Sequence, residues 1–257
     1  MRPAAVFPIH DPDGRLLVRL PGLLPDLKAA FEAAFVLPSP QTRAAQPEAM
    51  RLLEADPFFQ SFTLGGDPPV GDQFAFLYRR AIQASPGERL LHLCFLDRLA
   101  FALGTRHRAR FLADMASLTP DGAPRIYQRS AAAWDSHPRN YREIEGFVTA
   151  VGQLLFGRAL DYAWCHVAFT AAQLEQALSG VRNHDLSMVA ELILPFRETI
   201  HIQEVDWLAW EDPFVLGRDP AALRAEREAS AAETGKRLAY ALPMAAALQR
   251  FAMELEK

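Results

Sequence analysis

The stretch RLLHLCFLDRLAFAL, residues 89–103, decides the fold of this chain. Six of the eight residues from Leu90 to Asp97 are apolar, a short run typical of a strand that is buried on both faces of a parallel sheet. An acid and a guanidinium follow at once, Asp97 and Arg98. We therefore expect a central strand that presents a carboxylate at its carboxyl end.

On both sides of this stretch, short apolar runs alternate with helical patterns. Strands are expected over residues 4–9, 34–39, 58–64, 89–97, 124–129, 161–170 and 199–210. Helices are expected over residues 23–34, 47–56, 73–83, 107–118, 142–157, 170–181 and 185–195. This alternation predicts an α/β fold with three layers, in which helices cover both faces of a mostly parallel central sheet, plus C-terminal helices.

The chain is expected to form one domain with a helical extension. Residues 1–218 carry the strand and helix alternation, and residues 219–257 combine helix-forming residues with many charges. No linker rich in Gly, Ser or Pro separates the two parts, so we expect the extension to pack on the same domain. Its apolar stretch from Leu242 to Met253 is expected to pack on the core or on a second copy of the chain in a homodimer.

Composition excludes several classes of protein. The chain has 257 residues, 50% of them hydrophobic, so it can bury a large core. A net charge of -4 argues against a nucleic-acid binder, and no stretch is apolar for long enough to predict a transmembrane segment. Cys94 and Cys165 lack metal-site or disulfide spacing, which favours reduced core thiols and a cytoplasmic protein.

Polar side chains follow each of the first four expected strands. They are His10, Asp11 and Asp13, then Ser39, Gln41, Thr42 and Arg43, then Asp67 and Asp72 with Gly71 between them, and finally Asp97 and Arg98. Parallel strands end at the same edge of a sheet, and ligands of such folds bind outside that edge. These groups are therefore expected to converge there.

Purely structural roles compete with ligand binding at each of these positions. Asp11-Pro12-Asp13-Gly14 is also an ordinary turn sequence, and Asp72 also suits the N-cap of the next helix. Asp97 could cap the loop that follows its strand. The convergence of the whole set favours a site more than any one member does.

The order of these elements resembles the GT-A glycosyltransferases, the nucleotide-diphospho-sugar transferase fold, over roughly residues 4–215. In that family the loop after the first strand holds the nucleotide, as VFPIHDPDG could here. An acidic motif, usually Asp-x-Asp, follows the fourth strand and binds the metal and the diphosphate, and HLCFLDRLAF takes that place. The family's catalytic base lies at a later acidic helix start, where this chain has NHDLSMVAE.

The resemblance implies a transfer of sugar from a nucleotide-diphospho-sugar donor to an acceptor hydroxyl. Asp97 would bind a divalent cation, Mn or Mg, and Asp185 would be the catalytic base. The residues implied or expected to hold the nucleotide-sugar are Pro8, His10, Asp11, Ser39, Asp72, Arg98 and Arg129. The chain departs from the motif because Leu99 stands where the second acid is usual. Arg98 could instead neutralise the diphosphate without a metal.

Two other functions stay open at this point. One is another α/β enzyme that acts on phosphorylated substrates, such as a nucleotidyltransferase or a phosphatase-like hydrolase. FPIHDPDGR has one Gly and no Lys, unlike the Gly-rich loop expected of the first, and Pro12 is awkward between the paired acids expected of the second. The other function is a non-catalytic nucleotide- or partner-binding protein that keeps the fold, which the missing second acid favours.

Overall fold

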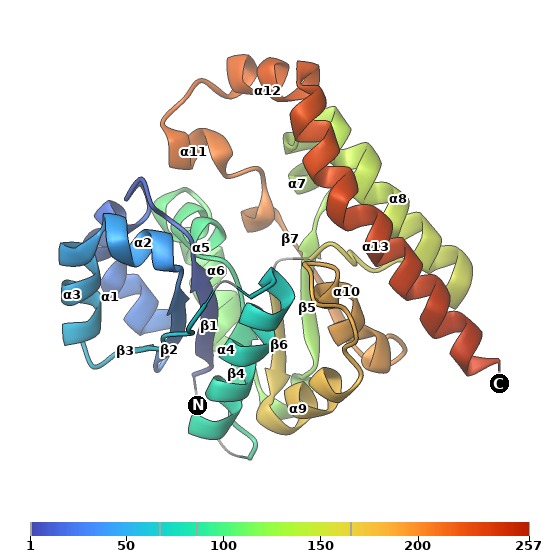
Figure 1. Ribbon diagram of the computed structural model, residues 1–257, viewed down its shortest axis with the longest axis horizontal. Coiled ribbons are helices and arrows are strands. Elements are labelled where there is room, and N and C mark those ends of the chain that lie inside the picture. Colours follow the sequence, from blue (N-terminus) through green and yellow to red (C-terminus); the bar gives the residue numbers. More distant parts are fainter. Residues whose placement is uncertain (1, 67, 86, 165, 257) are drawn as a thin grey trace.

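A seven-stranded sheet forms the centre of the computed structural model, which describes residues 2–66, 68–85, 87–164 and 166–256. The strands are β1 (Ala4–Ile9), β2 (Ala34–Pro38), β3 (Phe59–Ser61), β4 (Leu90–Leu93), β5 (Arg125–Arg129), β6 (His166–Thr170) and β7 (His201–Val205). Their spatial order is β3-β2-β1-β4-β6-β5-β7 (Figure 1). The first four expected strands are therefore neighbours, as predicted, and β4 is the central strand.

The sheet is mostly parallel, which confirms the predicted class. Pairs β1–β2, β1–β4, β2–β3 and β5–β7 are parallel, whereas β6 runs antiparallel to both β4 and β5. The reversal of β6 was not predicted. Strand β6 is buried along its whole length and carries no local signal of direction, because both of its faces are buried in either orientation.

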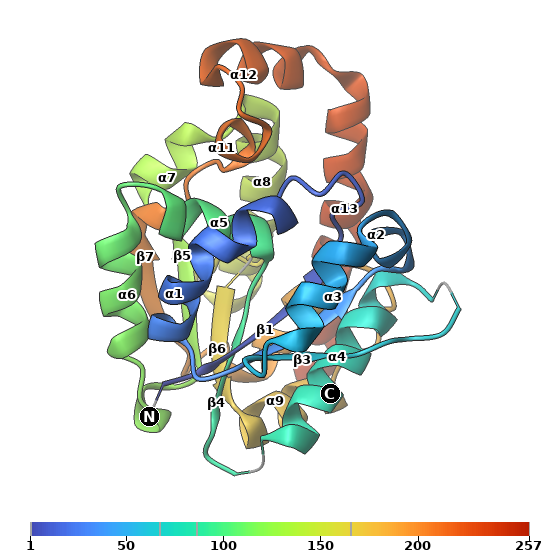
Figure 2. The same cartoon turned by 90° about the vertical axis from the view of Figure 1, so that its left-hand side faces the viewer.

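Helices cover both faces of the sheet, so the fold has three layers (Figures 1 and 2). The α-helices of the first half are α1 (Leu20–Ala30), α2 (Pro40–Ala45), α3 (Pro47–Ala55), α4 (Val70–Ala84), α5 (Leu96–Gly104) and α6 (Arg108–Ala116). Those of the second half are α7 (Ala131–Ser136), α8 (Arg139–Phe156), α9 (Ala171–Ser179), α10 (Met188–Ile193), α11 (Asp212–Leu216), α12 (Pro220–Ala229) and α13 (Ala231–Leu255). Short 3₁₀ turns include η1 (Leu17–Arg19) and η4 (Asp206–Leu208).

Alternate residues of the central strand enter two separate cores. Leu91 and Leu93 pack with residues of α4, α9, α10 and α13, whereas Leu90 and Cys94 pack with residues of α1, α5 and α6. Successive side chains of a strand point to opposite faces, so one apolar run supplies both layers. Full burial of each leucine contributes about 1.5–3 kcal/mol. Cys94 is a buried free thiol, as expected, and Cys165 lies outside the described residues.

The C-terminal extension is helical and packs on the same domain. Helix α13 runs beside α8 along much of its length (Figure 1). Met244 and Leu248 are fully buried in the core that also contains the strand residues, while Leu242 and Met253 are exposed. Part of the expected apolar stretch thus packs on the core. No helix among the described residues has the length and apolar character needed to cross a membrane.

Residues 89–103 turn from strand to helix earlier than expected. Strand β4 ends at Leu93 and α5 begins at Leu96, so Asp97 lies in the first turn of a helix rather than at the end of a strand. The spacing of Leu96, Leu99 and Leu103 at three and four residues places all three in one buried face. The sequence analysis had placed the helix only from residue 107.

Candidate functional site

A cavity of about 470 Å³ lies at the carboxyl ends of β1, β2 and β4, and we call it the sheet-edge pocket. Its lining residues are Pro8, Ile9, His10, Leu16, Leu37, Ser39, Gln41, Val70, Gln73, Phe74, Phe95, Leu96 and Asp97. Four residues that the sequence analysis assigned to the site are among them: Pro8, His10, Ser39 and Asp97. The volume lies in the range of small-molecule pockets in proteins, roughly 300–1,000 Å³.

His10 and Ser39 form the polar wall of the sheet-edge pocket beyond β1 and β2. The Nδ1 of His10 lies 3.0 Å from the Oγ of Ser39. The same Oγ accepts a hydrogen bond from the backbone N–H of Thr42 and so caps α2. The Thr42 hydroxyl in turn accepts the N–H of Asp11, which ties the loop after β1 to the start of α2. His10 itself stays exposed.

Asp11, which was also expected to hold the ligand, has a structural role instead of lining the pocket. Its carboxylate accepts the backbone N–H groups of Arg15, Leu16 and Leu17 at 2.8–2.9 Å. The side chain is buried and closes the turn that leads into η1. The turn interpretation of Asp11-Pro12-Asp13-Gly14 is the one that the structure matches.

Asp97 also lines the sheet-edge pocket, from the first turn of α5. Its Oδ1 accepts the backbone N–H of Arg98 at 2.8 Å, and the residue is half-buried. Burial raises the pKa of Asp97, and the nearby Asp212 raises it further, against the opposing effect of Arg98. A carboxylate with a raised pKa beside a cavity is a candidate functional group.

Arg98 does not line the sheet-edge pocket, and its guanidinium lies among several acids. Its guanidinium forms an ion pair with Glu211, contacts the Nε2 of His137 at 3.5 Å and donates to the carbonyl oxygen of Ala209 at 3.3 Å. Burial raises the pKa of Glu211 to about 8, helped by Asp97 and opposed by Arg98. Glu211 was not among the residues expected to form the site.

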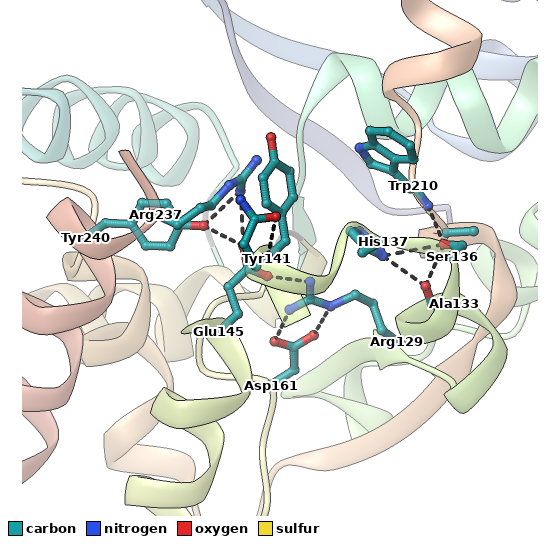
Figure 3. A network of polar contacts seen from close by, with 12 residues as sticks. Arg129, Ala133, Ser136, His137, Tyr141, Glu145, Asp161, Trp210, Arg237 and Tyr240 are labelled. Carbon is teal, nitrogen blue, oxygen red and sulfur yellow. Dashed lines mark hydrogen bonds and ion pairs between the residues drawn. The ribbon is translucent and has the colours of Figure 1, made fainter. Parts of the chain in front are cut away.

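Arg129 is the centre of a buried ionic network, which Figure 3 shows from close by. Its guanidinium donates two hydrogen bonds to Asp161, both of 2.7 Å, and one to Glu145 of 2.5 Å. Glu145 is shared with Arg237 at 3.0 Å and with the hydroxyl of Tyr240. Burial alone would raise the pKa of Glu145, but Arg129 and Arg237 lower it to about 2. The network ties β5 to α8 and α13 and does not line the sheet-edge pocket.

Asp72 and Asp185 lie on two segments that contact each other at the first turn of α4. Asp72 forms an ion pair with His184 at 2.7 Å, and the Oδ1 of Asp185 accepts the N–H of Ser187 at 2.8 Å. A Cβ at Gly71 would lie only 2.6 Å from the carbonyl oxygen of Asp185, so only glycine permits this approach. Both acids thus lie near Val70 and Gln73, but neither lines the pocket, and Asp67 lies outside the described residues.

Several pocket residues were not predicted from the sequence. Gln73 comes from the first turn of α4, and Phe95 immediately precedes α5. The start of a helix that follows a parallel strand lies at the ligand-binding edge, so the first turn of α4 was the available signal for Gln73. Phe95 was not predicted because an apolar side chain at that position is equally typical of a buried strand.

The acids and histidines of the chain do not gather into a protein-only metal centre in the part that the structure describes. Among the described residues, no group of three or more histidine, cysteine, aspartate or glutamate side chains could hold a metal ion. Asp97 supplies the carboxylate of the sheet-edge pocket. A divalent cation there would take most of its oxygen ligands from a bound phosphate and from water.

Comparison with known proteins gives one distant structural likeness. A solved structure described as the crystal structure of a mycobacterial protein is similar to this chain with a TM-score of 0.45 and 16% sequence identity, over 88% of this chain and 75% of that chain. Neither a family model nor a curated protein matches the chain.

Proposed function

We propose that the sheet-edge pocket binds a nucleotide-diphospho-sugar and that the chain transfers the sugar to an acceptor hydroxyl. The observation that carries this proposal is the meeting of His10, Ser39 and Asp97 in one cavity beyond β1, β2 and β4. The resemblance to GT-A glycosyltransferases led us to expect donor-binding groups at the ends of these same strands. The mostly parallel sheet and its ligand-sized cavity support it.

The lining of the sheet-edge pocket suits the parts of such a donor. Apolar side chains, among them Leu37 and Phe74, would pack on the base or the ribose, and His10 and Ser39 would hydrogen-bond to hydroxyl or phosphate oxygens. The first turns of α4 and α5 carry the partial positive charge of a helix N-terminus, which favours the diphosphate. Arg98 and Arg129 are proposed only to hold neighbouring groups in place, because both are already paired with carboxylates.

Asp97 would hold a divalent cation together with the diphosphate oxygens. Such a cation, when bound, neutralises charge on the departing diphosphate. In the transfer, the acceptor oxygen bonds to the anomeric carbon while the bond from that carbon to the diphosphate oxygen breaks. The electron pair leaves with the nucleoside diphosphate, and the hydroxyl proton passes to a carboxylate base.

Two carboxylates are candidates for that base. Asp185 is the one that the resemblance implies, although its carboxylate now accepts hydrogen bonds from Ser187 and would have to exchange them. Glu211 adjoins Arg98 and has a pKa raised to about 8, close to the working pH that suits an acid–base group. Single substitutions of each by the matching amide, assayed for transfer at saturating donor, would separate the two.

Donor binding is the first test of the proposed function. Purified protein is titrated with UDP-, GDP- and CDP-sugars, with and without manganese, while its thermal stability is followed, because a ligand of the native state raises stability by mass action. We expect one nucleotide to stabilise the protein, with the gain lost in Asp97→Asn. If none of these donors changes the melting temperature at millimolar concentration, the proposal fails.

A second candidate is a non-catalytic protein that binds a nucleotide through the same pocket. The observation in its favour is that Asp97 is the sole acid among the described pocket-lining residues, so the usual pair is incomplete. Donor binding with no detectable transfer to water or to any hydroxyl acceptor, and no donor hydrolysis, would favour this candidate. The two functions share a pocket and differ in the chemistry that follows binding.

A further inference from the structure

A second hollow opens about one helical turn along α5 from Asp97, and we call it the aromatic groove. It has a volume of about 370 Å³, and Phe101, Trp210, Phe214, Arg218 and Arg224 are among its lining residues. None of these residues lines the sheet-edge pocket. The groove is lined by residues of α5 and of the segment that contains α11, and these two helices contact each other.

Close contacts hold the aromatic walls of the groove in place. Phe101 and Phe214 meet edge to face with ring centres 6.0 Å apart. A Cβ at Gly104 would lie 2.5 Å from the ring of Phe214, so this ring sits directly on the helix backbone. The guanidinium of Arg19 covers the Phe214 ring at 4.7 Å. Ordered aromatic rings of this kind offer a surface on which the apolar face of a sugar ring can pack.

Arg224 gives the aromatic groove a positive charge that protein acids do not balance directly. Its guanidinium is half-buried and donates to the backbone carbonyl oxygens of Asp135 and Ser136. In the part of the chain that the structure describes, no carboxylate forms an ion pair with Arg224, whereas Arg218 is paired with Glu226 at 2.6 Å. A guanidinium oriented by neutral carbonyls keeps donors and charge for an oxyanion.

The aromatic groove adjoins the acidic end of the sheet-edge pocket. Phe101 follows Asp97 by four residues on α5, which puts both on one face of the helix. On the facing segment, Trp210 directly precedes Glu211, the partner of Arg98. A molecule in the groove would therefore lie beside the acids that the proposed transfer uses.

From these contacts we infer that the aromatic groove is the acceptor subsite and takes a sugar that carries a phosphate or carboxylate group. The acceptor role of the groove rests on the proposed transfer, whereas the binding of a charged sugar does not depend on it. The sugar ring packs on the aromatic walls, Arg224 binds the oxyanion, and a ring hydroxyl faces the Asp97 end of α5. The groove thus selects for both parts of the molecule at once.

Four small probes test the groove directly, by calorimetric or NMR titration without any nucleotide. Glucose 6-phosphate and glucuronate have both a sugar ring and an oxyanion. Glucose has the sugar ring alone, and inorganic phosphate has the oxyanion alone. We expect at least one of the two charged sugars to bind at least tenfold more tightly than either half. If neither charged sugar binds more tightly than inorganic phosphate, the inference is wrong.

Matched arginine variants locate the binding. Arg224→Gln should weaken the charged sugar about tenfold or more, as the loss of a charge-assisted hydrogen bond does. The control Arg51→Gln removes an exposed arginine that is paired with Glu48 and lines neither hollow, and it should change the affinity less than about threefold. Phe101→Leu should weaken the charged sugar and leave inorganic phosphate unchanged, which keeps the test valid if Arg224→Gln folds poorly. Equal affinity of wild type, Arg224→Gln and Phe101→Leu would overturn the assignment.

Failure of the groove and failure of the proposed transfer give different results. Asp97→Asn should lose donor binding but keep the charged-sugar affinity of the wild type, because Asp97 does not line the groove. Charged-sugar binding without any donor binding supports the groove as an oxyanion–sugar site and counts against the transfer. Donor binding without charged-sugar binding counts against the groove as an oxyanion–sugar site and supports the proposed transfer.

Discussion

Two arginines with little exposure at the carboxyl edge of the sheet show how differently the same residue type can be used. Arg129 is paired with Asp161 and Glu145, Glu145 is also paired with Arg237, and the pKa of Glu145 falls to about 2. Arg98 is paired with Glu211 close to Asp97, and there the pKa of Glu211 rises to about 8. Charges are balanced around Arg129, whereas acids are in excess around Arg98.

The difference separates a structural network from a functional candidate. A buried ion pair that is balanced and fully hydrogen-bonded holds elements together and leaves nothing for a ligand. An excess of acid beside a cavity costs free energy in the isolated protein, and a cation, a proton or a ligand hydroxyl can relieve that cost. Position at the end of a strand is therefore not enough to identify a ligand-binding residue.

The largest effect is expected from breaking the balanced network. Arg129→Gln leaves Asp161 and Glu145 buried with too little positive charge, which should lower the free energy of unfolding by about 3–5 kcal/mol. Urea denaturation measures this loss. Donor affinity at a temperature where the variant is folded should match that of wild type, and a loss of stability under about 1 kcal/mol would show that the network is not balanced as described.

A substitution of Glu211 is expected to raise the free energy of unfolding, whereas the substitution of Arg129 lowers it. The folded pKa of Glu211, about 8, lies above the ordinary value of 4.5, so the folded state binds the proton more tightly and stability falls as pH rises from about 4.5 to 8. Glu211→Gln removes this dependence and should be more stable than wild type by about 3 kcal/mol near pH 7, at 1.36 kcal/mol per pKa unit. At pH 4.5 the two should nearly coincide. A gap that does not grow with pH contradicts the raised pKa.

Asp97→Asn tests whether the acid-rich region near Arg98 binds a ligand. The substitution keeps shape and removes a charge that burial disfavours, so the free energy of unfolding should change by less than about 1 kcal/mol. Manganese-dependent donor affinity should fall at least tenfold, or about 1.4 kcal/mol. Calorimetric titration with and without manganese gives the result. Donor affinity equal to wild type in the presence of manganese would end the ligand role of this residue.

The smallest effects are expected in the loop after β1, where two neighbours should behave in opposite ways. Asp11→Ala removes the acceptor of three backbone N–H groups and should cost about 1–2 kcal/mol of stability, as loss of a cap does. His10→Ala should leave stability nearly unchanged and weaken the donor. Thermal denaturation and donor titration of both variants check this, and a reversed pattern would assign Asp11 to the ligand.

The sequence by itself determined the class of the fold and the four neighbouring strands. The runs at residues 4–9, 34–38 and 90–96 are apolar except for His92, so a sheet covered on both sides was the arrangement that buried them. The sequence also indicated the edge at which His10, Ser39 and Asp97 meet, because parallel strands end together. These inferences depend on local pattern and on general rules of chain topology.

Only the tertiary structure decided which polar residues are available to a ligand. Arg129 and Asp11 looked as suitable as Asp97 in the sequence, but their partners Asp161, Glu145 and the backbone of residues 15–17 are found only in the folded chain. The direction of β6 and the aromatic groove likewise depend on which distant segments meet. A residue type and its place after a strand fix what a side chain can bind, whereas the neighbours that folding brings to it decide whether that capacity is already used.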